Sequence, residues 1–316
     1  MELGVVDPNG SPDRQLEAMD RACRELGFFR IPIDVVDRDV RDRAWETAAA
    51  FFALDDATKR AIEFPEPGYP YGYSPFRAET LAKSLDDAEA QPDLKESLSV
   101  GPDCGAPRDP VDGEAWILSP SLWPAAVPEL RPAWTAYYRA LSEVAEQLMR
   151  IMALALDLSA DHFAPFIDRP ITSMRALHYP AAPSDGALPA GAHSASLRAG
   201  AHSDYGTFTI LRTDEVPGLE IVGPDGEWVG VEPDPDYFVV NLGDTIAQWT
   251  NDRWRSTLHR VVPAAEPRQS FAFFHMANWD ARIDCLPTCL APGETPRHEP
   301  AQAGPWLMRK FQSTVV

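Results

Sequence analysis

The sequence predicts an α+β protein with a double-stranded β-helix (jelly-roll) core flanked by α-helices. In the first half, apolar residues recur at helical spacing over long stretches. From about Ile171 onward, short alternating runs separated by Gly, Pro, Asn and Asp replace them, which is typical of an antiparallel sandwich or barrel. Helices packed outside two facing sheets accommodate both halves in one domain.

We expect that single domain to comprise residues 1–316. Residues 1–165 should form a mainly helical N-terminal region, residues 166–280 the jelly-roll core with the functional site, and residues 281–316 a C-terminal segment. The chain is 45% hydrophobic, which is enough to bury a sizeable core.

Helical periodicity predicts three helices in the first half. The first ends at Gly27, the second spans residues 37–62 and the third spans residues 129–158. Residues 28–31 predict a short strand between the first two. Residues 64–124 are rich in Pro, Gly and Asp, and we expect them to be mostly loop.

Alternating apolar residues predict the strands of the second half. These strands are expected at residues 172–179, 207–212, 219–222, 237–242, 245–249, 258–262 and 270–277. Residues 181–199 consist largely of Ala, Pro, Ser and Gly, so we expect a flexible loop there. Its position just before His202 makes it a candidate lid.

Composition disfavours several kinds of partner. The net charge of −20 and the pI near 4.7 disfavour nucleic acids and anionic membranes, which require cationic patches. No apolar run is long enough to span a membrane, and the N-terminus does not resemble a signal peptide. Four scattered cysteines fit a reducing compartment, so we expect a cytoplasmic protein.

The most informative motif is His202-Ser203-Asp204. On an extended strand, residues two apart project to the same face, so the imidazole and the carboxylate can meet. His259, in a later predicted strand, offers a second imidazole. Two imidazoles and one carboxylate form the ligand set of non-haem Fe(II) oxygenases. A hydrogen-bonded structural His–Asp pair is the alternative interpretation.

The chain contains an internal control for this motif. The letters Gly-Ala-His-Ser occur at residues 191–194 and again at residues 200–203. Ala195 occupies the position in the first copy that Asp204 occupies in the second. His193 therefore lacks a carboxylate partner, and we predict that it is not a ligand.

Arg268 and Ser270 form a second pair two residues apart on a predicted strand. A guanidinium binds a carboxylate through two hydrogen bonds, and a hydroxyl can add a third. Close to the metal site, the pair would hold the distal carboxylate of a dicarboxylate chelator. An ordinary surface arginine is the alternative for Arg268 considered alone.

Together these motifs resemble the iron- and 2-oxoglutarate-dependent dioxygenases, in the branch that includes isopenicillin N synthase and the plant gibberellin and flavonoid oxygenases. The resemblance covers nearly the whole chain. It rests on residues 22–29, 72–73, 93–97, 174–175, 179–180, 202–206, 241–244, 249–251 and 259–261.

The resemblance implies that His202, Asp204 and His259 hold catalytic Fe(II), and that 2-oxoglutarate and O2 are cosubstrates, with ascorbate as a stimulant. The expected activity is hydroxylation, desaturation or cyclisation of a small molecule. Composition adds the hypothesis of bacterial secondary metabolism, such as antibiotic biosynthesis. We expect a monomer or a weak homo-oligomer.

The resemblance also implies that Arg268 and Ser270 hold the far carboxylate of 2-oxoglutarate, and that Tyr179 hydrogen-bonds this cosubstrate. Leu177 occupies a position where many plant members carry Asn, so a packed core tyrosine is the alternative for Tyr179. Isopenicillin N synthase uses an Arg-x-Ser pair on its substrate's carboxylate. An Fe(II) oxidase without 2-oxoglutarate is therefore one alternative function, and a metal-free binding protein on the same fold is another.

Candidate substrate contacts are residues on predicted strands near these motifs. They are Arg175, Phe208, Trp249, Phe274 and His275. For the apolar residues a role in the core is the alternative, and for Arg175 it is an internal salt bridge.

Overall fold

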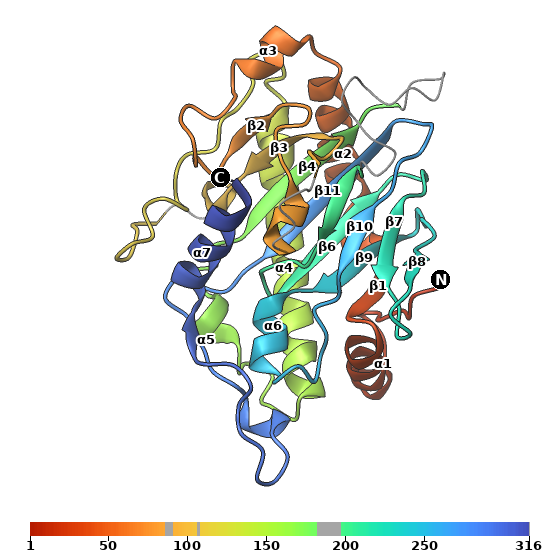
Figure 1. Cartoon of the computed structure of the whole chain (residues 1–316), viewed down its shortest axis with the longest axis vertical. Coiled ribbons are helices and arrows are strands. Elements are labelled where there is room, and N and C mark those ends of the chain that lie inside the picture. The colour runs from red at the N-terminus through yellow and green to blue at the C-terminus, as the bar shows by residue number, and fades with distance from the viewer. Residues whose placement is uncertain (86–90, 106–107, 182–196, 316) are drawn as a thin grey trace.

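Two antiparallel sheets form the centre of the protein (Figure 1). The computed structural model describes residues 1–85, 91–105, 108–181 and 197–315. The strand order of the larger sheet is β1 (Phe28–Pro32), β9 (Tyr237–Leu242), β6 (Phe208–Thr213), β11 (Arg268–His275), β4 (Ser173–Tyr179), β3 (Glu96–Val100) and β2 (Gly72–Ser74).

A smaller sheet completes the core. Its strand order is β5 (Ala199–His202), β10 (His259–Val261), β7 (Leu219–Val222) and β8 (Trp228–Gly230), and a separate pair joins β12 (Arg282–Ile283) to β13 (Ala301–Gln302). Side chains from both main sheets line one cavity. The predicted fold class, a jelly-roll core with flanking helices, is confirmed.

Helices cover the outer face of the larger sheet and the ends of the barrel. The α-helices are α1 (Pro12–Glu25), α2 (Arg38–Phe52), α3 (Asp56–Arg60), α4 (Leu130–Ala155), α5 (Ala164–Ile167), α6 (Asp244–Trp249) and α7 (Ala303–Val315). Short 3-10 turns are η1 (Ile33–Val35), η2 (Leu81–Leu85), η3 (Pro102–Cys104) and η4 (Pro287–Cys289). Figure 1 shows α4 running behind the larger sheet.

The contact between α4 and β11 decides which face of β11 is left for the site. Trp134 of α4 packs edge-on against Phe271, with ring centroids 4.8 Å apart, and Tyr138 packs against Phe273 at 5.3 Å. Because side chains alternate along a strand, the residues between these phenylalanines point to the other face of the sheet. That face lines the cavity.

Several predicted elements are confirmed. The first helix ends before Gly27, whose φ of 64° is left-handed. A Cβ at Gly27 would lie 2.0 Å from the carbonyl oxygen of Arg255, so close approach also requires glycine there. The predicted helix over residues 129–158 corresponds to α4, and the strand over residues 28–31 corresponds to β1.

Two predictions of local structure are wrong. The helix expected over residues 37–62 is two helices, because Asp55 caps α3 by accepting a hydrogen bond from the Thr58 backbone. Residues 245–249 form α6 and not a strand, because all five are buried and the run is too short to show a period. The described part of region 64–124 is mostly loop, as predicted, but it also contains β2 and β3, which pair within the sheet despite weak strand propensity.

The predicted loop over residues 181–199 falls largely outside the described residues, and β5 already begins at Ala199. Among the residues that the structure describes, no helix combines the length and apolar composition needed to cross a bilayer.

Candidate metal centre and its cavity

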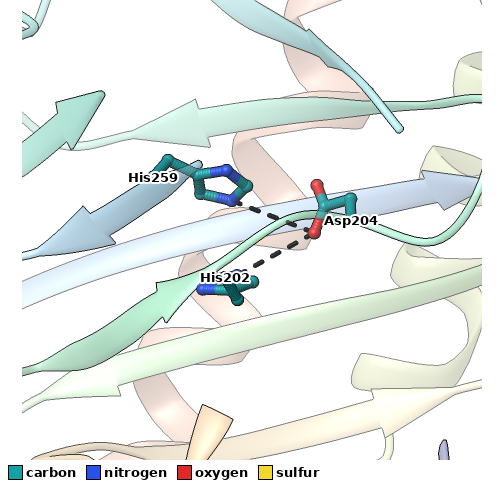
Figure 2. Close-up of side chains that lie close together, drawn as sticks. All are labelled: His202, Asp204 and His259. Atoms are coloured by element: carbon teal, nitrogen blue, oxygen red, sulfur yellow. Dashed lines mark ion pairs between the residues drawn. The ribbon is translucent and has the colours of Figure 1, made fainter. Parts of the chain in front are cut away.

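Two adjacent strands bring the two histidines together. In the pairing of β10 with β5, His259 lies directly opposite His202, and their ring centroids are 4.3 Å apart. Asp204 follows two residues after β5 ends, in the loop and not on an extended strand as expected. Its Oδ1 still lies 3.9 Å from the Nε2 atom of each histidine, as Figure 2 shows. Ligand atoms of the three residues all lie within 4.8 Å of one another, so they could hold one metal ion.

Backbone carbonyls fix the orientation of both imidazoles. The Nδ1 atom of His202 lies 2.7 Å from the Gly200 oxygen, and that of His259 lies 3.1 Å from the Thr257 oxygen. A carbonyl only accepts hydrogen bonds, so each Nδ1 carries the proton. Each Nε2 therefore presents its lone pair toward Asp204, as a metal ligand must.

Two side chains from the larger sheet orient the Asp204 carboxylate. Its Oδ2 accepts hydrogen bonds from the Asn241 amide at 2.6 Å and from the Thr209 hydroxyl at 2.5 Å. Asn241 on β9 and Thr209 on β6 are directly paired across the sheet. With Oδ2 occupied, Oδ1 is the oxygen that faces the histidines. Sequence reasoning assigned no role to either residue, although Asn241 lies in a motif that resembles the family.

Electrostatics keep the cluster in its metal-binding protonation state. Burial, with a contribution from His259, lowers the pKa of His202 to about 3. Burial alone would raise the pKa of Asp204, but the two imidazoles and its two hydrogen bonds outweigh burial and lower it. At neutral pH His202 is therefore neutral and Asp204 is ionised, as divalent metal binding requires.

Arg268 supplies a buried cation that has no ion pair among the described residues. Its side chain belongs to the cavity face of β11, and the residue is 3% exposed. Its Nε and Nη1 atoms have no hydrogen-bond partner in the described part of the chain. Ser270 lines the same cavity, and Tyr179 lies opposite Arg268 in the sheet, with the guanidinium 5.1 Å from its ring. An unpartnered buried guanidinium fits a carboxylate of a bound small molecule.

The cavity has a volume of about 440 Å³, within the range of small-molecule sites. It includes only two of the five predicted substrate contacts, Arg175 and Phe274. The other three do not belong to its lining. Phe208 stacks on His275 at 4.8 Å, with His275 on the helix-facing side of β11, and Trp249 packs on Phe163 at 5.1 Å.

Sequence reasoning missed one whole part of the cavity. Residues from the expected loop region supply it, among them Glu79, Lys95 and Ser99. No local spacing marks Glu79 or Ser99, because their partner Arg175 lies on β4, far along the chain.

The fold and the site together define a class of protein. A jelly roll that brings two imidazoles and one carboxylate to the edge of a cavity, beside an unpartnered buried guanidinium, is the architecture of a non-haem metal oxygenase with a carboxylate-bearing cosubstrate.

Comparison with known proteins gives the family. Residues 170–277 match the 2OG-Fe(II) oxygenase superfamily, and residues 2–126 match the N-terminal model of a non-haem dioxygenase in morphine synthesis. The chain is 34% identical over 290 residues to the 2-oxoglutarate-Fe(II) type oxidoreductase hxnY of Emericella nidulans, covering 90% of this chain and 80% of the relative. It is 30% identical over 287 residues to the 2-oxoglutarate-dependent dioxygenase citB of Monascus ruber, covering 88% and 84%.

A solved structure agrees over almost the full length. A full-length Neurospora crassa protein, crystallised in complex with alpha-KG and thymine, superposes with a TM-score of 0.82 at 27% identity, covering 98% of this chain and 96% of that one. The chain therefore belongs to the 2-oxoglutarate- and Fe(II)-dependent oxygenase superfamily.

Family membership confirms the predicted enzyme class and cofactors. The protein is an oxidoreductase that uses Fe(II) and 2-oxoglutarate, and it acts on small molecules. The donor set at residues 202, 204 and 259 and the unpartnered atoms of Arg268 fit these two groups. The two relatives above are fungal, so they give no support to the predicted bacterial origin.

Proposed function

We propose that the protein hydroxylates, desaturates or cyclises a small molecule, with the metal held by His202, Asp204 and His259. The observation that carries this proposal is the presence, in one cavity, of a three-ligand cluster and an unpartnered buried guanidinium. When bound, Fe(II) with 2-oxoglutarate and O2 supplies the oxidising chemistry. The chain's own residues bind, orient and shield the reactants.

Each residue has a defined task in this proposal. The Nε2 atoms of both histidines and Oδ1 of Asp204 would hold the metal. Arg268 and Ser270 anchor the distal carboxylate of 2-oxoglutarate, and Tyr179 borders this anchor. Apolar side chains around the anchor, including Leu211 and Val261 of the same cavity, exclude water and so strengthen the charged contacts.

We further propose a role in secondary metabolism. Support comes from relatives such as clavatol oxidase claD of Penicillium crustosum, 27% identical over 293 residues. The four scattered cysteines support a cytoplasmic enzyme, and the net charge of −20 supports one without a nucleic-acid or membrane partner. We propose that it acts as a monomer or a weak homo-oligomer.

Succinate formation tests the proposed function. The purified protein, supplied with Fe(II), ascorbate, O2 and candidate substrates, should release succinate only when 2-oxoglutarate is present. Arg268→Met is the comparison variant. It keeps the metal ligands but lacks the carboxylate anchor, so it should release very little succinate. Substrate oxidation that is independent of 2-oxoglutarate would contradict the proposal and favour an oxidase.

A further inference from the structure

The residues that sequence reasoning missed form a polar patch inside the cavity together with Ser173 and the predicted contact Arg175. We use that term for Glu79, Lys95, Ser99, Ser173 and Arg175. They come from β3, β4 and the segments that precede β3, at one edge of the larger sheet (Figure 1). Ser99 and Arg175 are directly paired across β3 and β4, and Ser173 is two residues from Arg175 on the same face of β4.

The charges of the polar patch compensate one another. Arg175 Nη1 lies 3.0 and 3.2 Å from the two oxygens of Glu79, and its Nε donates to the Ser99 hydroxyl at 2.8 Å. Lys95 Nζ lies 3.3 Å from Glu79 and 2.5 Å from Asp93. Together with Asp93, which lies beside the patch, two cations face two carboxylates, so these four charges sum to zero.

Glu79 and Lys95 are held in their charged forms at neutral pH. Burial alone would raise the pKa of Glu79, but Arg175 and Lys95 outweigh it and lower the pKa to about 2. Burial alone would lower the pKa of Lys95, but Asp93 and Glu79 outweigh it and raise the pKa. A ligand at this patch therefore meets fixed dipoles of both signs and no free charge.

Charged ligands are disfavoured at such a surface. A carboxylate that approaches Arg175 also approaches the Glu79 carboxylate, and a cation that approaches Glu79 also approaches Arg175 and Lys95. A neutral group with both a donor and an acceptor meets no like charge. Glu79 can accept a hydrogen bond, and Arg175 and the half-buried Ser173 hydroxyl can donate one.

Aromatic side chains line the rest of this part of the cavity. The hydroxyl of Tyr69 donates to the Pro120 oxygen and that of Tyr71 to the Ile117 oxygen, each at 2.7 Å. The indole N–H of Trp116 donates to a backbone oxygen at the same distance. Because backbone acceptors occupy these polar atoms, the rings present apolar faces to a ligand. We define the aromatic set as Phe64, Tyr69, Tyr71, Trp116, Phe274 and Phe311.

We propose that the substrate is an uncharged planar ring compound that carries an amide-like edge with one donor and one acceptor. The edge binds the polar patch, and the ring lies against the aromatic set. Phe274 is directly paired with Ser173 across β11 and β4, so the two surfaces meet there. This inference rests on the proposed function, since it assigns the occupant of the same active site.

Three isosteric probes test the inference. Benzamide, benzoate and benzamidinium share size and shape but are neutral, anionic and cationic. Each would be titrated by calorimetry, without O2, into the full-length protein loaded with redox-inert Mn(II) and 2-oxoglutarate. We expect benzamide to bind at least tenfold more tightly than either ion. Tightest binding of benzoate or benzamidinium, or no binding of any probe, would overturn the inference.

Glu79→Gln provides the sharper test, because it leaves the patch with one uncompensated positive charge. Benzoate should then gain at least tenfold in affinity, while benzamidinium should not gain. The matched control is Glu63→Gln, which removes a cavity carboxylate that pairs with Arg60 outside the patch. No gain in benzoate affinity in Glu79→Gln, or the same gain in Glu63→Gln, would contradict the proposal.

Two further measurements distinguish a wrong substrate class from a wrong proposed function and from a variant that does not fold. Binding of 2-oxoglutarate to the Mn(II)-loaded protein is measured first, and its absence would contradict the proposed function and not the substrate class. If Glu79→Gln does not fold, Ser173→Ala is the second variant. It should weaken benzamide binding severalfold and leave benzoate unchanged, and equal effects on both probes would contradict the proposal.

Discussion

A buried arginine, Arg268, and a half-buried one, Arg175, line the same cavity on neighbouring strands, but only Arg175 has a charged partner. Arg268 on β11 has two nitrogen atoms without a partner among the described residues, whereas Arg175 on β4 contacts Glu79 and Ser99. An unpaired buried charge is costly, so a protein keeps one where a ligand will supply the counter-charge. Arg268 is therefore suited to an anionic guest, and Arg175 to a neutral one.

Both arginines are proposed to bind reactants of a metal held by residues 202, 204 and 259. Removing a metal ligand therefore has the largest expected effect. In His202→Ala, one of the three ligands is lost, so we expect no detectable Fe(II) binding and no succinate formation. Iron content measures metal binding, and succinate release measures activity. The matched control is His193→Ala, a histidine outside the described residues, which should retain both. Equal loss in the two variants would refute the ligand assignment.

Replacing each arginine by methionine tests the comparison directly. Arg268→Met should weaken 2-oxoglutarate binding by about 30-fold or more, since loss of one partner of a buried charge pair costs about 2–5 kcal/mol. Arg175→Met should leave 2-oxoglutarate affinity nearly unchanged and weaken substrate binding. Anaerobic titration of the Mn(II)-loaded variants with 2-oxoglutarate, and then with benzamide as the substrate probe, measures the two affinities. A similar loss in the two variants would show that the arginines do not have separate guests.

A smaller effect is expected at the residues that orient Asp204. Asn241→Ala removes one of the two donors to Oδ2 and lets the carboxylate rotate. Loss of such an outer partner weakens metal affinity by about 10–100-fold, which Mn(II) titration can measure. Thr209→Val should act in the same direction, and Thr209→Ser should restore the affinity. Wild-type affinity in Asn241→Ala would mean that Asp204 needs no such support.

The predicted site residues that the structure brings together carry their signal in local spacing. Arg268 and Ser270 are two residues apart on β11 and so share one face; His202 and Asp204 are also two apart, and they meet although Asp204 lies beyond the end of β5. The same rule separates two of the predicted substrate contacts. Phe274 and His275 are adjacent on β11, so only one of them can face the cavity, and it is Phe274.

The polar patch could not be predicted because its contacts depend on the folded sheet. Glu79 and Arg175 are 96 residues apart in the sequence, and nothing near either residue indicates the other. β3 has serines where strands usually have branched residues, so its composition resembled a loop. Only its pairing between β2 and β4 shows that Lys95 and Ser99 border a cavity.

His275 is a third ionisable side chain on this sheet, and it is buried in its neutral form. Of the variants proposed, its substitution should have the smallest effect, a change in how stability depends on pH. Burial lowers the pKa of His275 to about 3, below the value of about 6.5 in an unfolded chain. Below pH 6.5 the unfolded state binds a proton that the folded state does not, so stability falls as the pH falls toward 3. Between pH 7 and pH 5 this loss amounts to about 2 kcal/mol. His275→Asn, which can keep a hydrogen bond to Thr207, should lose about that much less between the two pH values in urea denaturation of the metal-free protein. An equal loss in both proteins would mean that His275 is already charged, and that the helix side of β11 does accept an unpaired charge.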